Sequence, residues 1–248
     1  MSAFASLLQE LDRWQLAGRI ADLWLRDDDA VEPTLALSQL LARSAAADVP
    51  IVVAAIPMLA TEDLAKRLAA ESMAVVWQHG ISHANNAGPG QKKQELLDAS
   101  PEVLRGLADG WQRLQHVFLA QTQAVLVPPW NRIAPDLVFC LPGTGLDGLS
   151  TYRPRQQPFA APGVWQVNTH VDVVDWRNGR KFIGTSRACK EIVAHLSARR
   201  IGAADPDEPT GILTHHLTMD ESAWVFLSDL FGLTNSHPAA RWCVPNRE

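Results

Sequence analysis

The sequence has little of what marks several large classes of protein. Its three cysteines, Cys140, Cys189 and Cys243, are odd in number and far apart, so they indicate neither a disulfide framework nor a cysteine-based zinc site. The formal net charge is -5, and no Lys/Arg-rich stripe is present to neutralise phosphates. We therefore expect no nucleic-acid partner.

Long apolar runs are also missing. No run approaches the length needed to cross a bilayer, and residues 1–14 lack the basic start and continuous apolar centre of a secretion signal. We expect a cytoplasmic protein with no membrane partner. Hydrophobic residues make up 47% and charged residues 20% of the 248-residue chain, which is the balance of a globular domain with a substantial core.

The chain does contain short apolar runs that alternate with longer helical patterns, which is typical of β-α units around a largely parallel sheet. We predict a single domain over residues 1–248, with residues 1–18 as an N-terminal helical extension. The predicted strands span 21–26, 50–56, 74–78, 124–127, 145–150, 164–168 and 211–214. The predicted helices span 3–17, 34–47, 61–72, 102–121, 135–141, 185–199 and 220–231.

Polar residues gather where these predicted strands end. The run Asp27-Asp28-Asp29 follows the first strand, and His79 follows the third, with His83 four residues further on. In a parallel barrel the carboxyl ends of the strands meet on one face, so these residues can form one site. A carboxylate and two imidazoles suit a divalent transition metal such as zinc, and a spare carboxylate can act as a base.

Each of these motifs also has an ordinary structural interpretation. The acidic run can be a solvated turn or a helix N-cap, and the histidines can be unrelated to it. Three adjacent carboxylates repel one another, however, and a cation removes that conflict. The zinc-protease pattern requires a glutamate directly after the first histidine, and Gly80 in that position excludes it.

Three further segments offer catalytic groups. His215 and His216 follow the last strand, where alternation directs one of them into the site as an acid and leaves the other structural. The segment Asp172–Trp176 offers a carboxylate to orient such a histidine, together with an aromatic wall. In the rigid loop Pro128–Arg132, Arg132 could pair with the base carboxylate.

Taken in order, these segments resemble the polysaccharide deacetylase (NodB-homology) family, also called carbohydrate esterase family 4. The order and rough spacing of the five motifs hold from residue 21 to about residue 217. The matching positions are Asp28-Asp29, His79 with His83, Pro128–Arg132, Asp172–Trp176 and Leu213-Thr214-His215.

The resemblance implies an α/β fold, a distorted (β/α) barrel with about seven strands. It implies a divalent metal, with zinc favoured, held by Asp29, His79 and His83. Asp28 is then the base for the metal-bound water, and His215 is the acid that protonates the departing amine. Supporting roles fall to Arg132, which holds the base, to Asp175, which tunes His215, and to the pocket residues Trp130, Trp176 and Leu213.

The chain departs from the family pattern at several positions. A register shifted by one residue would make Asp27 the base and Asp28 the ligand; we prefer the first register because Ala30 is small where the family has glycine. Val127 stands where the family has an arginine before its prolines, and Gly80 replaces a serine or threonine. These departures affect how the base is held and remove no ligand.

We therefore expect a metal-dependent hydrolase that removes an N-acetyl or related acyl group from a sugar or small amide. Family members that act on cell-wall or capsule polymers are usually exported, and this chain shows no export signal. The substrate is therefore expected to be a small soluble N-acyl compound or carbohydrate. Two alternatives remain open: a metal-independent amidohydrolase acting on a cyclic amide, and a catalytically silent barrel that binds a sugar or partner. The sequence leaves the acyl group and the oligomeric state open.

Overall fold

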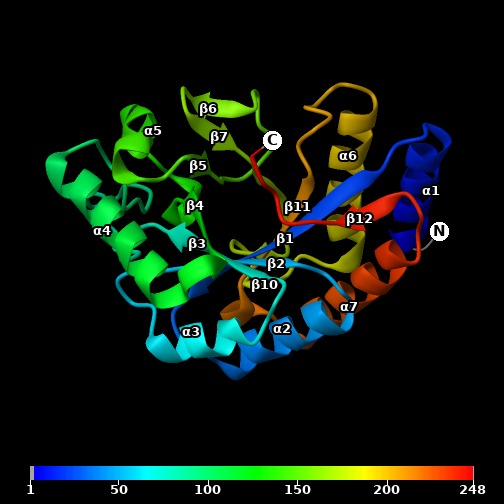
Figure 1. Ribbon diagram of the computed structural model, residues 1–248. Coiled ribbons are helices and arrows are strands. Elements are labelled where there is room, and N and C mark those ends of the chain that lie inside the picture. The colour runs from blue at the N-terminus through cyan, green and yellow to red at the C-terminus, as the bar shows by residue number, and fades with distance from the viewer. Residues whose placement is uncertain (1–2, 248) are drawn as a thin grey trace.

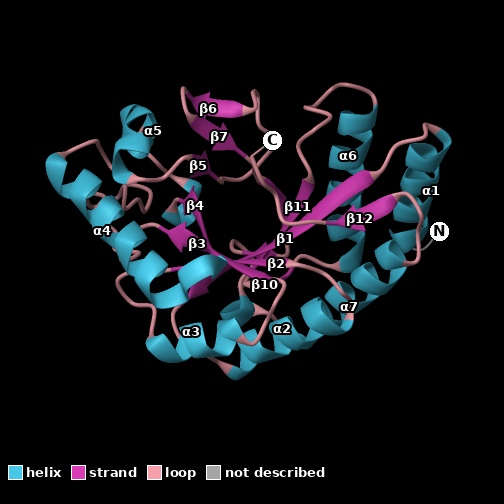
Figure 2. Ribbon diagram, viewed as in Figure 1, coloured by secondary structure: helices cyan, strands magenta, loops and turns pink. Residues whose placement is uncertain are grey.

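The computed structural model describes residues 3–247 and shows a curved sheet with helices packed around its outer face (Figures 1 and 2). The strands β6-β7-β5-β4-β3-β2-β1-β11-β8 follow one another in that order, and β12 pairs with the start of β1. All of these pairings are parallel except that of β6 with β7. These strands are β1 (Ala21–Ala30), β2 (Ile51–Ala55), β3 (Ala74–His79), β4 (Thr122–Val127), β5 (Gly148–Leu149), β6 (Phe159–Ala161), β7 (Val164–Gln166), β8 (Thr169–Asp172), β11 (Thr210–Thr214) and β12 (Ala240–Trp242).

The sheet closes on itself after β5. An isolated parallel bridge joins Tyr152 to Thr169, the first residue of β8, and Thr169 exchanges backbone hydrogen bonds with Thr151 and Arg153. The strands therefore surround a central core in an irregular ring. This closure confirms the predicted distorted barrel.

Helices cover the outside of this barrel. They are α1 (Ala3–Leu16), α2 (Leu35–Ala46), α3 (Glu62–Ala69), α4 (Pro101–Phe118), α5 (Pro135–Cys140), α6 (Thr185–Arg200) and α7 (Glu221–Asn235). Short 3-10 helices occupy Leu119–Gln121, Pro129–Asn131, Leu141–Thr144 and His216–Thr218. Threonine hydroxyls at Thr34 and Thr61 accept the third backbone N–H of α2 and α3, so both helices begin at a side-chain cap. No helix within residues 3–247 is long and apolar enough to span a bilayer.

The alternation of β1 explains where the core lies. Leu23 and Leu25 point outward into the layer beneath the helices, whereas Trp24 points into the barrel against Val52 and Trp77. The same alternation continues into the acidic run, so Asp27 faces outward and Asp28 faces inward. The charged end of this strand is thus divided between two sides of the sheet.

The acidic run belongs to β1, which continues four residues beyond its predicted end at Arg26. Its pairing with β2 shifts register between Asp27 and Ala30, and Asp29 within the bulge has a φ of 71°. The strand persists because Asp27 and Ala30 still pair with β2 and because the carboxylates have partners in the fold. The bulge also turns Asp29 toward the same end of the barrel as Asp28.

Five short strands were not predicted. The strands β6, β8 and β12 have three or four residues each. The strands β9 (Val174–Asp175) and β10 (Lys181–Phe182) have two residues each and pair as an antiparallel hairpin. The predicted strand at residues 145–150 shortens to β5, since residues 141–144 form a 3-10 helix that ends at Gly145. Such pairings depend on neighbours in space and leave little periodic signal.

Candidate active site

A cavity of about 430 Å³ opens where the parallel strands end. Side chains from β1, from the loops after β3, β4 and β11, and from the segment beginning in β8 converge on it. Its lining is formed by Asp28, Asp29, His79, His83, Lys93, Trp130, Asn131, Arg132, Asp172, Trp176, Arg180 and His215. Most of the residues singled out from the sequence therefore share one site.

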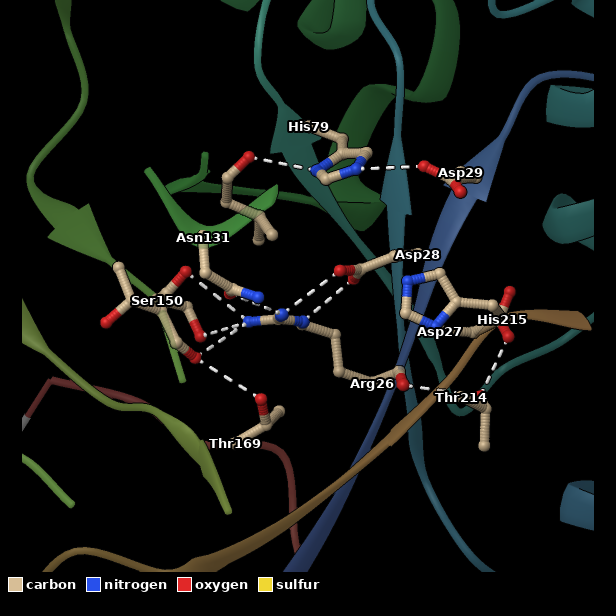
Figure 3. A network of polar contacts seen from close by, with 12 residues as sticks. Arg26, Asp27, Asp28, Asp29, His79, Asn131, Ser150, Thr169, Thr214 and His215 are labelled. Carbon is tan, nitrogen blue, oxygen red and sulfur yellow. Dashed lines mark hydrogen bonds and ion pairs between the residues drawn. The ribbon is translucent and has the colours of Figure 1, made fainter. Parts of the chain in front are cut away.

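Three ligand atoms face one another at the base of this cavity. His79 Nδ1 donates to the carbonyl of Val127 at 2.9 Å, which leaves Nε2 to face Asp29 Oδ1 at 3.1 Å (Figure 3). His83 Nε2 lies 3.3 Å from the same oxygen. In a tetrahedral zinc site with bonds of about 2.0–2.1 Å, neighbouring ligand atoms are roughly 3.3 Å apart. The three side chains therefore fit a divalent ion, with the second nitrogen of His79 already fixed by the backbone.

The charge of Asp29 matches this arrangement. Burial by itself raises the pKa of the Asp29 carboxyl, but the hydrogen bond with His79 and the charges of His79, His215 and His83 outweigh burial and lower the pKa. The carboxylate is therefore ionised at neutral pH, as a metal ligand must be.

The loop between the two histidines is held by a buried glutamate. Glu95 is 2% exposed, and its carboxylate accepts the backbone N–H groups of Ile81, Ser82 and Ala84 as well as the Ser82 hydroxyl. His83 has a φ of 60°, so the histidines are brought together by a tight loop instead of a helical turn. Glu95 thereby shapes the backbone that presents His83.

Gly80 is required in this loop for two reasons. Its φ is 62°, and an added Cβ would lie 2.1 Å from Oε2 of Glu95 and 2.5 Å from Cγ of Pro129. A serine or threonine at this position would displace either the glutamate or the proline loop. The departure from the family pattern thus accompanies a specific packing arrangement.

Arg26 holds the predicted base. Its Nε and Nη2 atoms donate to the two oxygens of Asp28 at 2.8 Å and 3.0 Å, and Nη1 donates to the Ser150 hydroxyl at 2.8 Å. Figure 3 shows the guanidinium between Asp28 on one side and Asn131 and Ser150 on the other. The side chain of Arg26 is fully buried.

The prediction that Arg132 pairs with Asp28 is corrected by this geometry. Arg132 Nη1 donates to the Lys93 carbonyl at 2.6 Å, at the edge of the cavity. Arg26 takes the position because it lies two residues before Asp28 on the same face of β1.

Asp27 lies on the other side of the sheet. It is fully buried, its Oδ1 accepts the Thr214 hydroxyl at 2.7 Å and the His216 N–H at 2.9 Å, and its Oδ2 is 2.5 Å from His216 Nδ1. Burial lowers the pKa of His216, but the charge of Asp27 and the hydrogen bond with it outweigh burial and raise it. The structure thus separates Asp27 and His216 from the cavity that Asp28, Asp29 and His215 line.

His215 projects into the cavity, with its ring edge-on to Trp176 at a centroid distance of 4.7 Å. Its Nδ1 faces Asp172 Oδ1 at 3.9 Å. Burial raises the pKa of Asp172, although His215 opposes that shift, and the Trp176 indole donates to its other oxygen at 2.7 Å. Asp172 is therefore the carboxylate that faces His215.

Asp175, predicted to tune His215, has different neighbours. Its oxygens accept the backbone N–H groups of Arg177 and Asn178 and the Asn178 side chain, and Arg187 lies 3.4 Å away. It stabilises the turn between β9 and β10 and is absent from the cavity lining. The predicted carboxylate is the wrong one, because Asp175 ends β9 and binds the backbone of the turn that leads to β10.

The three predicted pocket residues differ in position. Trp130 packs against His83 with ring centroids 4.4 Å apart, and Trp176 packs against His215, so the tryptophans lie against different site histidines. Leu213 is fully buried in β11, in register with Arg26 and Asp172, and is absent from the cavity lining.

A second group of metal-ligand residues lies at the start of β11: His170, His195 and Glu208, all buried. His170 Nδ1 accepts the Gly211 N–H at 2.9 Å, so the neutral ring carries its proton on Nε2, which faces Glu208 Oε2 at 3.3 Å. A metal at Nε2 would have to displace that proton. In the first group, His79 Nδ1 donates to the Val127 carbonyl, so Nε2 is the nitrogen that faces the other two ligands.

Solved structures share this fold. No protein-family model and no curated protein matches the sequence. A Mycobacterium smegmatis protein assigned to the polysaccharide deacetylases matches with a TM-score of 0.66 at 15% identity, over 91% of this chain and 87% of that one. A Streptococcus mutans family 4 carbohydrate esterase matches with a TM-score of 0.58 at 12% identity, over 97% and 91%.

A family 4 acetyl xylan esterase from Clostridium thermocellum, solved with a cobalt ion, has a TM-score of 0.51 at 14% identity, over 90% of this chain and 87% of its own. At such low identity these matches concern the fold. They agree with the barrel and with the predicted resemblance. The chain has the fold of the polysaccharide deacetylases, carbohydrate esterase family 4.

Proposed function

We propose that the protein is a metal-dependent hydrolase that removes an N-acetyl or related acyl group from a sugar or small amide. One observation carries the proposal: three converging ligand atoms, a separately held carboxylate and a histidine with its own carboxylate line a single cavity. A binding protein would have no need of two carboxylates with such different partners.

Asp29, His79 and His83 would hold the metal. One oxygen and two imidazole nitrogens suit zinc, and the similar acetyl xylan esterase was solved with cobalt, which accepts the same donors. When bound, such an ion acts as a Lewis acid toward the acyl carbonyl and makes water more acidic.

Asp28 serves as the base in this proposal. Arg26 fixes both of its oxygens, and a carboxylate has further lone pairs with which to accept a proton from the attacking water. The side chain of Asp28 is 5% exposed, so the proton transfer takes place in a site largely shielded from solvent. Positioning by a buried arginine keeps the accepting oxygen in place between turnovers.

His215 serves as the acid. It donates a proton to the leaving nitrogen, and the adjacent Asp172 stabilises the positive charge of the ring before that transfer. The indole of Trp176 holds Asp172 through its N–H and lies edge-on to the histidine ring. These contacts restrict both partners to one orientation.

The test combines metal content and turnover. Purified protein is assayed for acetate release from N-acetylglucosamine, from its oligomers and from small N-acetyl amides, before and after chelation. We expect activity to disappear with the chelator and to return with zinc or cobalt. Undiminished turnover after complete metal removal would support the metal-independent amidohydrolase instead. Protein that neither binds zinc nor releases acetate would support a silent barrel.

A further inference from the structure

The rim of the cavity carries three cationic side chains: Lys93, Arg132 and Arg180. They come from segments far apart in the sequence, namely the loop before α4, the loop after β4 and the turn before β10. Within residues 3–247 none of the three has a carboxylate oxygen within 4.0 Å, whereas Arg155, Arg200 and Arg241 each have one. Unpaired cations therefore surround one opening in a chain with an excess of acidic residues.

Two of these cations lie over tryptophan rings. The Lys93 ammonium lies 5.8 Å from the ring centroid of Trp130, and the Arg180 guanidinium lies 6.0 Å from that of Trp176. Arg132 is tied to the Lys93 backbone. Each tryptophan also packs against a site histidine. Lys93 and Arg180 are exposed whereas His83 and His215 are half-buried, so these two cations lie nearer to solvent than the histidines.

The charges within the cavity do not cancel those of the rim. Arg26 compensates Asp28, which leaves Asp29 and Asp172 as the cavity carboxylates without an arginine partner. The three rim cations outnumber these two, and a divalent ion would add further positive charge. Such a cavity attracts anions and disfavours a second cation.

We infer that the substrate carries an anionic group, a phosphate or a carboxylate, which Lys93, Arg132 and Arg180 bind while the acyl group lies at the metal. The inference rests on the proposed function and adds the chemical class of its substrate. Guanidinium groups bind phosphate and carboxylate through paired N–H donors, and the exposed lysine adds a mobile charge. The tryptophans supply flat apolar surfaces for a sugar ring that lies between the metal and the rim cations.

The test measures acetate release from N-acetylglucosamine and compares it with release from three anionic compounds. These are its 1-phosphate, its 6-phosphate and N-acetylmuramic acid, which carries a carboxylate. We expect kcat/KM for at least one anionic compound to exceed that for N-acetylglucosamine by about tenfold or more, and to fall as salt rises. Comparison of the sugar phosphates with N-acetylmuramic acid shows whether the site prefers a phosphate or a carboxylate. Equal, salt-insensitive rates for neutral and anionic compounds would overturn the inference and leave the proposed function intact.

Variants make the test specific. Arg180→Ala and Lys93→Ala should each lower the anionic-to-neutral ratio of kcat/KM about tenfold, whereas Arg180→Lys should retain part of it. Arg177→Ala and Lys92→Ala serve as matched controls, since both side chains are exposed and outside the cavity lining. An unchanged ratio in Arg180→Ala and Lys93→Ala would contradict the inference.

Calorimetric binding of N-acetylglucosamine 6-phosphate provides a readout without turnover. Salt-sensitive binding that Arg180→Ala weakens, in a protein with no deacylase activity, would support the anion site and refute the proposed reaction. Absence of binding by every anionic compound, with acetate still released from neutral sugars, would refute the anion site alone.

Discussion

The guanidinium of Arg26 binds both carboxylate oxygens of Asp28, two residues further along the same strand, from a fully buried position inside the barrel. The arginine that holds Asp28 thus comes from the first strand, whereas the position before Pro128 is Val127, the last residue of β4. Because a two-residue spacing in a strand keeps both side chains on one face, the pair is set by local geometry.

Replacement of Asp28 by asparagine should separate catalysis from metal binding. Asp28→Asn cannot accept the proton of the attacking water, so turnover should fall by about 10²–10⁴-fold. Metal content should remain at the wild-type level, because Asp28 is not among the three converging ligands. Parallel measurement of bound zinc and acetate release checks this, and simultaneous loss of both would assign Asp28 to the metal.

Asp29 and Asp27 should give opposite results. Asp29→Ala removes the oxygen that faces both histidines, so metal affinity should be lost while the fold persists. Asp27→Asn should retain the metal and lower the free energy of unfolding by roughly 2 kcal/mol, because a buried acceptor of the Thr214 and His216 hydrogen bonds is weakened. Metal titration and urea unfolding of both variants test the assignment, and retention of metal by Asp29→Ala would shift the register by one residue.

The predicted site residues that the structure brings together are those at the ends of buried strands. Apolar runs located β1, β2, β3 and β11, and the rule that parallel strand ends converge brought Asp29, His79 and His215 together. The exact end of β1 was missed, because a bulge in the middle of an acidic run has no periodic signal.

Other contributions to the site depend on tertiary contacts. Glu95 lies in a loop without pattern and acts on a backbone 11 to 14 residues away, so nothing in its local sequence marks it. Arg26 does have a signal in the sequence, because a charged residue at the end of an apolar strand needs a partner when it is buried. Asp172 and Asp175 are equally plausible by spacing, and only the β9–β10 hairpin separates them.

Gly80 and Gly18 provide a matched pair of glycines with similar backbone angles. Both have positive φ, 62° and 66°, but an added Cβ meets Glu95 and Pro129 at Gly80 and nothing within 4 Å at Gly18. Gly18→Ala should cost about 1 kcal/mol of stability from backbone strain alone. Gly80→Ala should cost on the order of 3 kcal/mol and also weaken metal binding, because the loop bearing His83 must move. Equal unfolding curves for the two variants would show that the Glu95 and Pro129 side chains move aside at little cost in free energy.

His195 should make stability depend on pH in a predictable direction. Its pKa is lowered to about 2, first by burial and then by the charges of His170 and Arg199. The folded ring stays neutral, whereas the unfolded ring takes up a proton below about pH 6.5. The contribution of His195 to stability is therefore present above pH 6.5 and is lost as the pH falls from there toward 2. The loss is at most about 1.4 kcal/mol per pH unit.

His195→Gln removes this titration, so the free energy of unfolding of the variant should fall less steeply than that of the wild type between pH 6.5 and 4.5. Urea unfolding at several pH values gives the slope of the unfolding free energy against pH for both proteins. Groups that titrate alike in the two proteins contribute equally to both slopes and drop out of the difference. Glu208, whose pKa burial raises to about 7, acts in the opposite direction, since its contribution is present below about pH 4.5 and is lost as the pH rises to 7. His116→Gln, on the exposed face of α4, is the matched control substitution. If His195→Gln keeps the wild-type slope, the buried ring must take up its proton in the folded protein.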